Sequence, residues 1–136
     1  MLVDLRTAIY TIGATISGST GGFYYSDPPQ EANTPYITYF LIDDVYNRAD
    51  TQIREDVVSI QFSLFDRRLT SAGNKISSVA LEKTAEELIT KFDKVNLTIA
   101  GYTSADFKRQ FTRPAEVIEG GEYWQMLIQY QLILNK

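Results

Sequence analysis

The sequence contains no cysteine and no histidine among its 136 residues. The absence of cysteine excludes disulfides, thiolate metal sites and cysteine nucleophiles. The absence of histidine removes the side chain that most often serves as a general base or as a ligand of transition metals. Any catalysis would depend on carboxylates, lysine, tyrosine or hydroxyl groups. We therefore expect a protein that is not an enzyme and that holds no cofactor.

Positive charge is also scarce, with 13 lysines and arginines against 17 acidic residues and a net charge of −4. Proteins that bind nucleic acid broadly through phosphates carry a basic surplus, so tight binding of that kind is disfavoured. The longest apolar run, Tyr39–Ile42, is too short to span a bilayer. The first residues, Met1–Asp4, lack the features of a signal peptide. We expect a soluble protein made in a reducing compartment.

The residues that are present favour a folded chain, since 44% are apolar and only 22% are charged. This length and composition predict one domain spanning residues 1–136. Two segments have the period of an amphipathic helix. In the first, Leu2, Leu5, Ile9, Ile12 and Ile16 form one stripe and Gly18 is the expected C-cap. The second helix is expected to start at Thr70 or Ser71 and to end at Phe92.

Strand patterns occupy much of the remaining chain. Residues 36–46 are rich in aromatic and β-branched types, and residues 57–65 and 124–134 alternate between apolar and polar side chains. Shorter strands are predicted at 23–25, 95–99 and 106–113, with an irregular connection at 26–35 and a hairpin turn at 119–122. This order predicts an α+β fold, with one mainly antiparallel sheet and two helices packed on one face.

Two constellations have a chemical and a structural interpretation. Asp43-Asp44 and Glu55-Asp56 have the ligand type for Mg²⁺ or Ca²⁺, but neighbouring strand residues point to opposite faces, so we expect solvated strand ends. In residues 106–113, alternation places Phe107, Arg109, Phe111 and Arg113 on one face. That stretch suits a nucleic-acid contact, but arginine packed beside aromatics in a sheet or a subunit interface is the commoner arrangement.

The last predicted strand has an outer face suited to a protein contact. Gln125, Gln129 and Gln131 lie there together with Leu127 and Ile133, so this face is neither dry nor heavily charged. Plain solvent exposure is the alternative. Charge is unevenly distributed, with a net −3 over residues 31–70 and +1 over residues 71–110. This asymmetry suggests that copies meet head to tail, as in a cyclic ring.

Several segments together resemble a known family. These are P-Y-I-T-Y (Pro35 to Tyr39), V-S-I-Q-F-S-L-F-D (Val58 to Asp66), S-A-G-N-K-I (Ser71 to Ile76) and W-Q-M-L-I-Q-Y-Q-L-I-L (Trp124 to Leu134), preceded by a short amphipathic helix. In this order the chain resembles the tail-completion or tail-terminator proteins of long-tailed bacteriophages and prophages. The likeness extends over nearly the whole chain, and its motifs contain no catalytic residues.

The resemblance implies a structural virion subunit, made in the bacterial host cytoplasm, that forms a ring, expected to be a hexamer. Such a ring caps the tail tube, stops polymerisation of the tube protein and presents a surface to the head–tail connector protein. It implies that DNA passes through the lumen without specific binding and that no membrane is involved. The charged segment Asn47–Asp56 would be an arm reaching a neighbour, with Arg48, Asp50, Ile53 and Arg54 as candidate contacts.

Two other functions fit the same sequence. A head-side adaptor or stopper protein of the phage neck has the same sequence features as a tail cap. A cellular ligand-binding α+β domain would instead be a monomer or dimer with a concave pocket. A carboxylate-based enzyme would need two acids in one cleft, whereas the acids here lie at the edges of loops.

Overall fold

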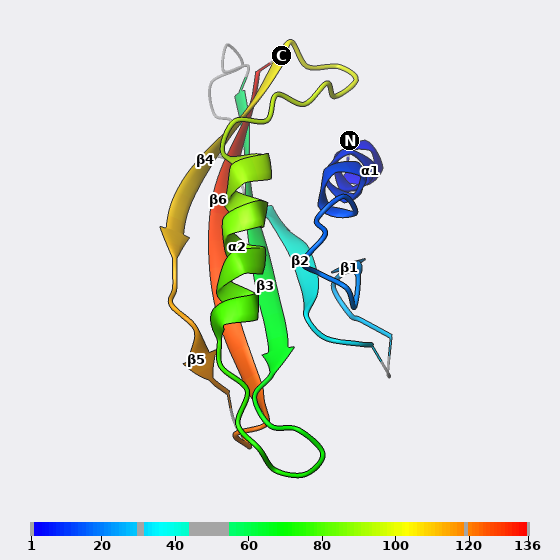
Figure 1. Cartoon of the computed structure of the whole chain (residues 1–136). Helices are drawn as coiled ribbons and strands as arrows, with labels where there is room; N and C mark the ends of the chain where they lie inside the picture. Colours follow the sequence, from blue (N-terminus) through cyan, green and yellow to red (C-terminus); the bar gives the residue numbers. More distant parts are fainter. Residues whose placement is uncertain (1, 30–31, 44–54, 119, 136) are drawn as a thin grey trace.

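The computed structural model describes residues 2–29, 32–43, 55–118 and 120–135 (Figure 1). Two helices and six strands occur in these ranges. In chain order they are α1 (Leu2–Gly13), β1 (Phe23–Tyr25), β2 (Tyr36–Asp43), β3 (Glu55–Arg67), α2 (Val79–Phe92), β4 (Ser104–Thr112), β5 (Glu116–Val117) and β6 (Tyr123–Asn135). The order of one helix, three strands, one helix and three strands agrees with the expected number of elements, but the last three strands differ from the predicted ones, because residues 95–99 are not a strand and β5 was not predicted.

All the strands belong to one sheet, in the order β1-β2-β3-β6-β4, with β5 also paired to β6. The pairings β2–β3, β3–β6, β4–β6 and β5–β6 are antiparallel, and β1 runs parallel to β2. The two central strands β3 and β6 have 13 residues each and pair along their whole length. The predicted α+β class, with a mainly antiparallel sheet, is therefore confirmed.

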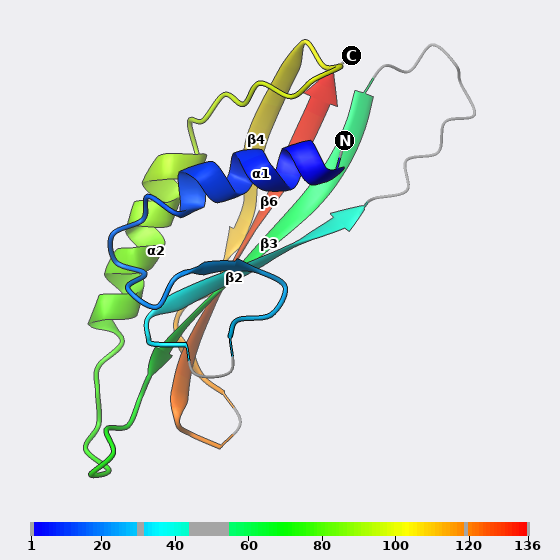
Figure 2. The ribbon, with the colours of Figure 1, turned by 90° about the vertical axis from the view of Figure 1, so that its right-hand side faces the viewer.

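Both helices cover the same face of this sheet. Helix α2 lies along β3 and β6, while α1 crosses in front of the sheet near β2 (Figures 1 and 2). The buried side of α2 consists of Leu81, Thr84, Ala85, Leu88 and Phe92. Between the helices and the sheet, Phe62 is fully buried, and its ring centroid lies 4.8 Å from that of Phe92. The alternating residues of β3 and β6 thus supply the floor of one apolar core.

Helix α1 ends earlier than predicted, at Gly13, and Gly18 is not its C-cap. A side chain on residue 13 would collide with the ring of Phe23, which packs directly against the helix end. The chain then turns through hydrogen bonds from the N–H of Thr15 to the carbonyl of Ile12 and from Ile16 to Gly13. Ile16 still joins the core, with 3% of its surface exposed, so its apolar spacing was correct although its helical conformation was not.

Helix α2 begins later than predicted, at Val79 rather than at Thr70 or Ser71. The intervening residues form a turn in which Gly73 has φ = +83°, a backbone conformation that favours glycine. The N–H of Gly73 bonds to the carbonyl of Thr70, and the N–H of Ile76 bonds to the carbonyl of Arg68. These bonds close a loop against the end of β3, so a helix cannot start before it.

Two strand predictions also differ from the structure. Residues 95–99 are not a strand, because only Asn96 forms an isolated bridge, to Asp106. The predicted strand at 36–46 is described as far as Asp43, and residues 44–46 lie outside the described residues. Residues 55 and 56, predicted as part of an arm, belong to β3 and pair with Asn135 and Leu134.

Strand β4 contains a bulge that changes which side chains share a face. Its register shifts between Arg109, which is opposite Tyr130, and Phe111, which is opposite Gln129. Phe107 and Arg109 therefore face the helices, whereas Phe111 faces the other side of the sheet. The prediction that Phe107, Arg109, Phe111 and Arg113 share one face is wrong, because one inserted residue reverses the alternation.

Candidate assembly interface

The second face of the sheet carries no helix within the described residues, and we call it the open face (Figure 2). Cross-strand partners on it include Phe40–Gln61–Gln129 and Ile42–Ser59–Gln131, taken across β2, β3 and β6. Many of its side chains are half-buried by their neighbours, and Thr38, Ser59 and Ser63 are buried. An uncovered sheet face with this mixture of aliphatic and amide groups suits contact with another protein.

The structure brings the three predicted glutamines together on this face. Gln125, Gln129 and Gln131 are half-buried and pair across β3 with Phe65, Gln61 and Ser59. On the same side of β6, Leu127 lies between Gln125 and Gln129, and Ile133 follows Gln131. Their common placement follows directly from the period of two residues in β6. That they bind another subunit remains a prediction.

An aromatic cluster occupies one end of the open face. Tyr36 stacks on Phe65 with their centroids 5.1 Å apart. Burial and the neighbouring Tyr123 raise the pKa of Tyr36 above its ordinary value. The guanidinium of Arg67 lies 5.8 Å from the ring centroid of Tyr123. Tyrosine and arginine in such a cluster are typical of protein interfaces.

The other predicted contact residues, Arg48, Asp50, Ile53 and Arg54, lie outside the described residues. Of the two acidic pairs, Asp44 is also outside them, and the register places Asp43 opposite Val58 rather than opposite Glu55 or Asp56. Across the described residues, no three histidine, cysteine or acidic side chains gather in a way that could hold a metal ion. In the same ranges, no helix is long and apolar enough to cross a membrane.

A groove that the sequence did not reveal lies between α1 and the β1 end of the sheet. It has a volume of about 420 Å³ and is lined by Val3, Arg6, Thr7, Tyr10, Phe23, Tyr24, Tyr25 and Tyr39. The guanidinium of Arg6 lies 3.6 Å from the ring centroid of Tyr25. Val3 and Tyr10, on its helical wall, are 72% and 53% exposed. The spacing of seven residues places Val3 and Tyr10 on one side of a helix, and this was the only signal in the sequence. The groove itself depends on the angle at which α1 packs, which the sequence does not show.

Glu87 fastens the loop after α1 to helix α2. Its carboxylate accepts hydrogen bonds from the backbone N–H groups of Ser17 (2.8 Å) and Gly18 (3.0 Å), and from the Ser17 hydroxyl. Desolvation raises the pKa of Glu87, but these hydrogen bonds and the charge of Lys91 outweigh it. They hold the pKa below its ordinary value of 4.5. Together with the buried residues Leu5 and Ile9, this contact holds α1 in place beside the groove.

Replacing Glu87 with glutamine should lower the free energy of unfolding by about 1–2 kcal/mol, because charge-assisted hydrogen bonds become weaker neutral ones. Since the pKa is depressed in the folded state, the stabilisation is fully present above the ordinary carboxylate range and is lost as the pH falls through the folded pKa. Urea unfolding at neutral pH and at decreasing pH measures this. The exposed neighbour variant Glu86→Gln should show neither effect, and equal behaviour of the two variants would contradict the assignment.

A second fixed contact joins α2 to the β4 side of the sheet. The buried Tyr130 donates a 2.6 Å hydrogen bond to the carboxylate of Asp93, at the end of α2. Burial and this hydrogen bond both raise the pKa of Tyr130. Arg109 forms an ion pair with the same carboxylate at 3.3 Å. Arg109, a candidate for nucleic-acid contact in the sequence, is thus engaged within the fold.

Comparison with known proteins relates this chain to solved structures. No protein-family model matches the sequence, and no curated protein matches it. Among solved structures, the fold is similar to a chain of the virion of a native gene transfer agent particle, with a TM-score of 0.72 and 13% sequence identity. The match covers 99% of this chain and 97% of that chain. At this identity the likeness establishes a shared fold over nearly the whole length of both chains.

Proposed function

We propose that this protein is a structural subunit of a phage-like virion, made in the host cytoplasm and built into the tail or neck. We further propose that residues 1–136 form one domain. This domain is a tail-terminator subunit, and its copies form a ring at the end of the tail tube. The observation that carries the proposal is the full-length fold match to a chain of a virion particle. The open face supports it, because a subunit of a multi-protein particle needs surfaces that other subunits cover.

In physical terms, the proposed activity is assembly. A ring closes when each copy uses two different surfaces and the rotation between neighbours returns to the start after a fixed number of copies, which we expect to be six. One end of this ring would cover the last layer of tube protein and stop its polymerisation, and the other would meet the head–tail connector. The acidic balance of the chain disfavours adhesion of DNA passing through the lumen.

The experiment that tests this function asks which particle retains the chain. Finished tails and tail-less heads are purified separately, and the chain is quantified in each by mass spectrometry. The proposal predicts retention on tails, in a few copies per tail. Retention on heads alone would contradict the tail-terminator function and would indicate a head-side neck adaptor instead. Absence from both, with the chain free in the lysate, would reject a virion role.

A further inference from the structure

The second half of β4 is exposed to an extent unusual for a strand. Each residue from Lys108 to Thr112 is exposed, although the strand is hydrogen-bonded to the long central strand β6. No other described strand pairs with β4 on its outer side, and the bridge from Asn96 reaches only Asp106. Phe111 is 38% exposed. An open strand edge with an exposed aromatic side chain is ready for pairing with another chain.

This edge is also positively charged. Lys108, Arg109 and Arg113 occur within six residues, and no acid lies among them. Arg109 is paired with Asp93, whereas Arg113 lies over the ring of Phe111 at 5.8 Å. Among the described residues, no ion pair holds Lys108 or Arg113. Arg113, beside the ring of Phe111, and Lys108 are both exposed, and we call residues 108–113 the basic edge.

The opposite edge of the sheet has a weak complementary charge, carried by the one acid of residues 24–27. No lysine or arginine occurs between residues 7 and 47. Asp27 is exposed and lies two residues after the end of β1, and Tyr24 and Tyr25 of β1 line the groove. The same groove contains one cation, Arg6, whose guanidinium lies over the ring of Tyr25. We call residues 24–27 the acidic edge.

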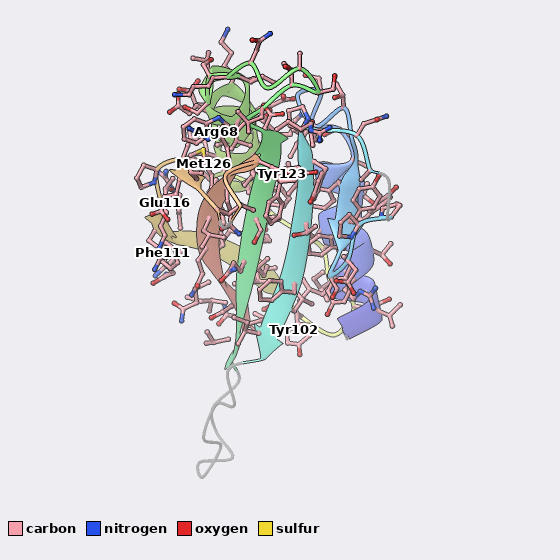
Figure 3. The ribbon with its side chains drawn as sticks, turned by 90° about the horizontal axis from the view of Figure 1, so that it is seen from below. Arg68, Tyr102, Phe111, Glu116, Tyr123 and Met126 are labelled. Atoms are coloured by element: carbon pink, nitrogen blue, oxygen red, sulfur yellow. The ribbon has the colours of Figure 1, made fainter. Side chains whose placement is uncertain are left out.

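The strand order places these two edges as far apart as the sheet allows, with β1 at one end and β4 at the other. Figure 3 shows Phe111 and Glu116 on one side of the molecule and α1 and β1 on the other. Two complementary patches on opposite sides of one subunit cannot satisfy each other within that subunit. They can be satisfied between copies by a heterologous contact, which is the contact that builds a ring.

We propose that the basic edge of one copy docks on the acidic edge of the next copy, so that copies join head to tail through the opposite edges of their sheets. Lys108 and Arg113 approach Asp27, and Phe111 packs against the tyrosines at the groove. This inference rests on the proposed ring and assigns the surfaces that join its subunits. Screening by salt should weaken the contact, because the charges are exposed before docking.

The test uses charge reversal of the full chain, with association measured by sedimentation velocity up to millimolar concentration. Lys108→Glu with Arg113→Glu should weaken self-association by more than about tenfold, and so should Asp27→Lys alone. Combining the three substitutions should restore association at least in part. Lys83→Glu with Lys94→Glu is the matched control, since it makes the same change in net charge at exposed residues of α2 and its end.

A mixing experiment tests whether the losses of association come from mismatched charges and not from misfolding. The Lys108→Glu/Arg113→Glu variant keeps its acidic edge, and the Asp27→Lys variant keeps its basic edge. In an equimolar mixture these two unchanged edges can pair, and the two reversed edges can pair with each other. Association of the mixture should therefore exceed that of either variant alone. Unchanged association of both variants, or no association of the wild type at millimolar concentration, would overturn the proposal. If the chain is nevertheless retained on purified tails, the proposed tail function holds, and only the assignment of the basic and acidic edges as the contact surfaces is rejected.

Discussion

Replacing Phe62 with alanine should lower the free energy of unfolding by about 3–5 kcal/mol. Phe62 is fully buried at the centre of the aromatic core, where its ring meets those of Phe92, Tyr130, Tyr39 and Phe23. These rings come from β1, β2, β6 and α2, so a cavity at Phe62 removes contacts to four elements together. Urea unfolding followed by far-UV circular dichroism measures the loss.

Phe65→Ala is the matched control, because it changes the same residue type on the same strand but on the open face. Phe65 is half-buried and its main aromatic partner is Tyr36. The smaller area that it hides from water implies a loss of about 1 kcal/mol. Equal losses for the two variants would contradict the assignment of the two faces of the sheet.

Placing two glutamates on the open face, Leu127→Glu with Gln129→Glu, should reduce the amount of the chain on purified particles by about a hundredfold or more. In the isolated subunit both positions reach solvent, so the glutamates stay hydrated and the strand loses only about 1 kcal/mol in propensity. In a covered interface the same carboxylates would be buried without partners. An unpaired buried charge costs about 3–5 kcal/mol, and about 2.8 kcal/mol already corresponds to a hundredfold.

The control for this variant is Ser71→Glu with Ala72→Glu, which adds the same charge in an exposed loop. Quantitative mass spectrometry of purified particles gives the amounts, and urea unfolding of the free proteins shows whether the fold is intact. Wild-type retention of the open-face variant would show that this face stays in solvent, and Gln125, Gln129 and Gln131 would then not be contact residues.

The central strands β3 and β6 were predictable from the sequence because each of their two faces has its own type of residue. In β3 and β6, apolar residues alternate with serine and glutamine, since one face packs under the helices and the other is open. This period of two residues identifies the strand, its buried side and the three glutamines opposite. The uncovered face of β3 and β6 could therefore be predicted without knowing where β2 and β4 lie in the sheet.

Other features depend on tertiary contacts that a period cannot show. The turn at Gly73 combines a positive φ with hydrogen bonds to the end of β3, and neither of these follows from the apolar spacing of the sequence. The bulge in β4 inverts the face of Phe111 without any glycine or proline to mark it. The groove requires α1 to cross beside β1, an arrangement fixed in part by Glu87 from a helix seventy residues away.

Electron microscopy of the purified protein, alone at high concentration and mixed with purified tail tubes, tests most directly whether this chain works by docking to copies of itself. We expect closed rings of uniform diameter, and caps of the same diameter at one end of each tube. Tubes with bare ends, and a protein that remains a single particle under both conditions, would contradict it.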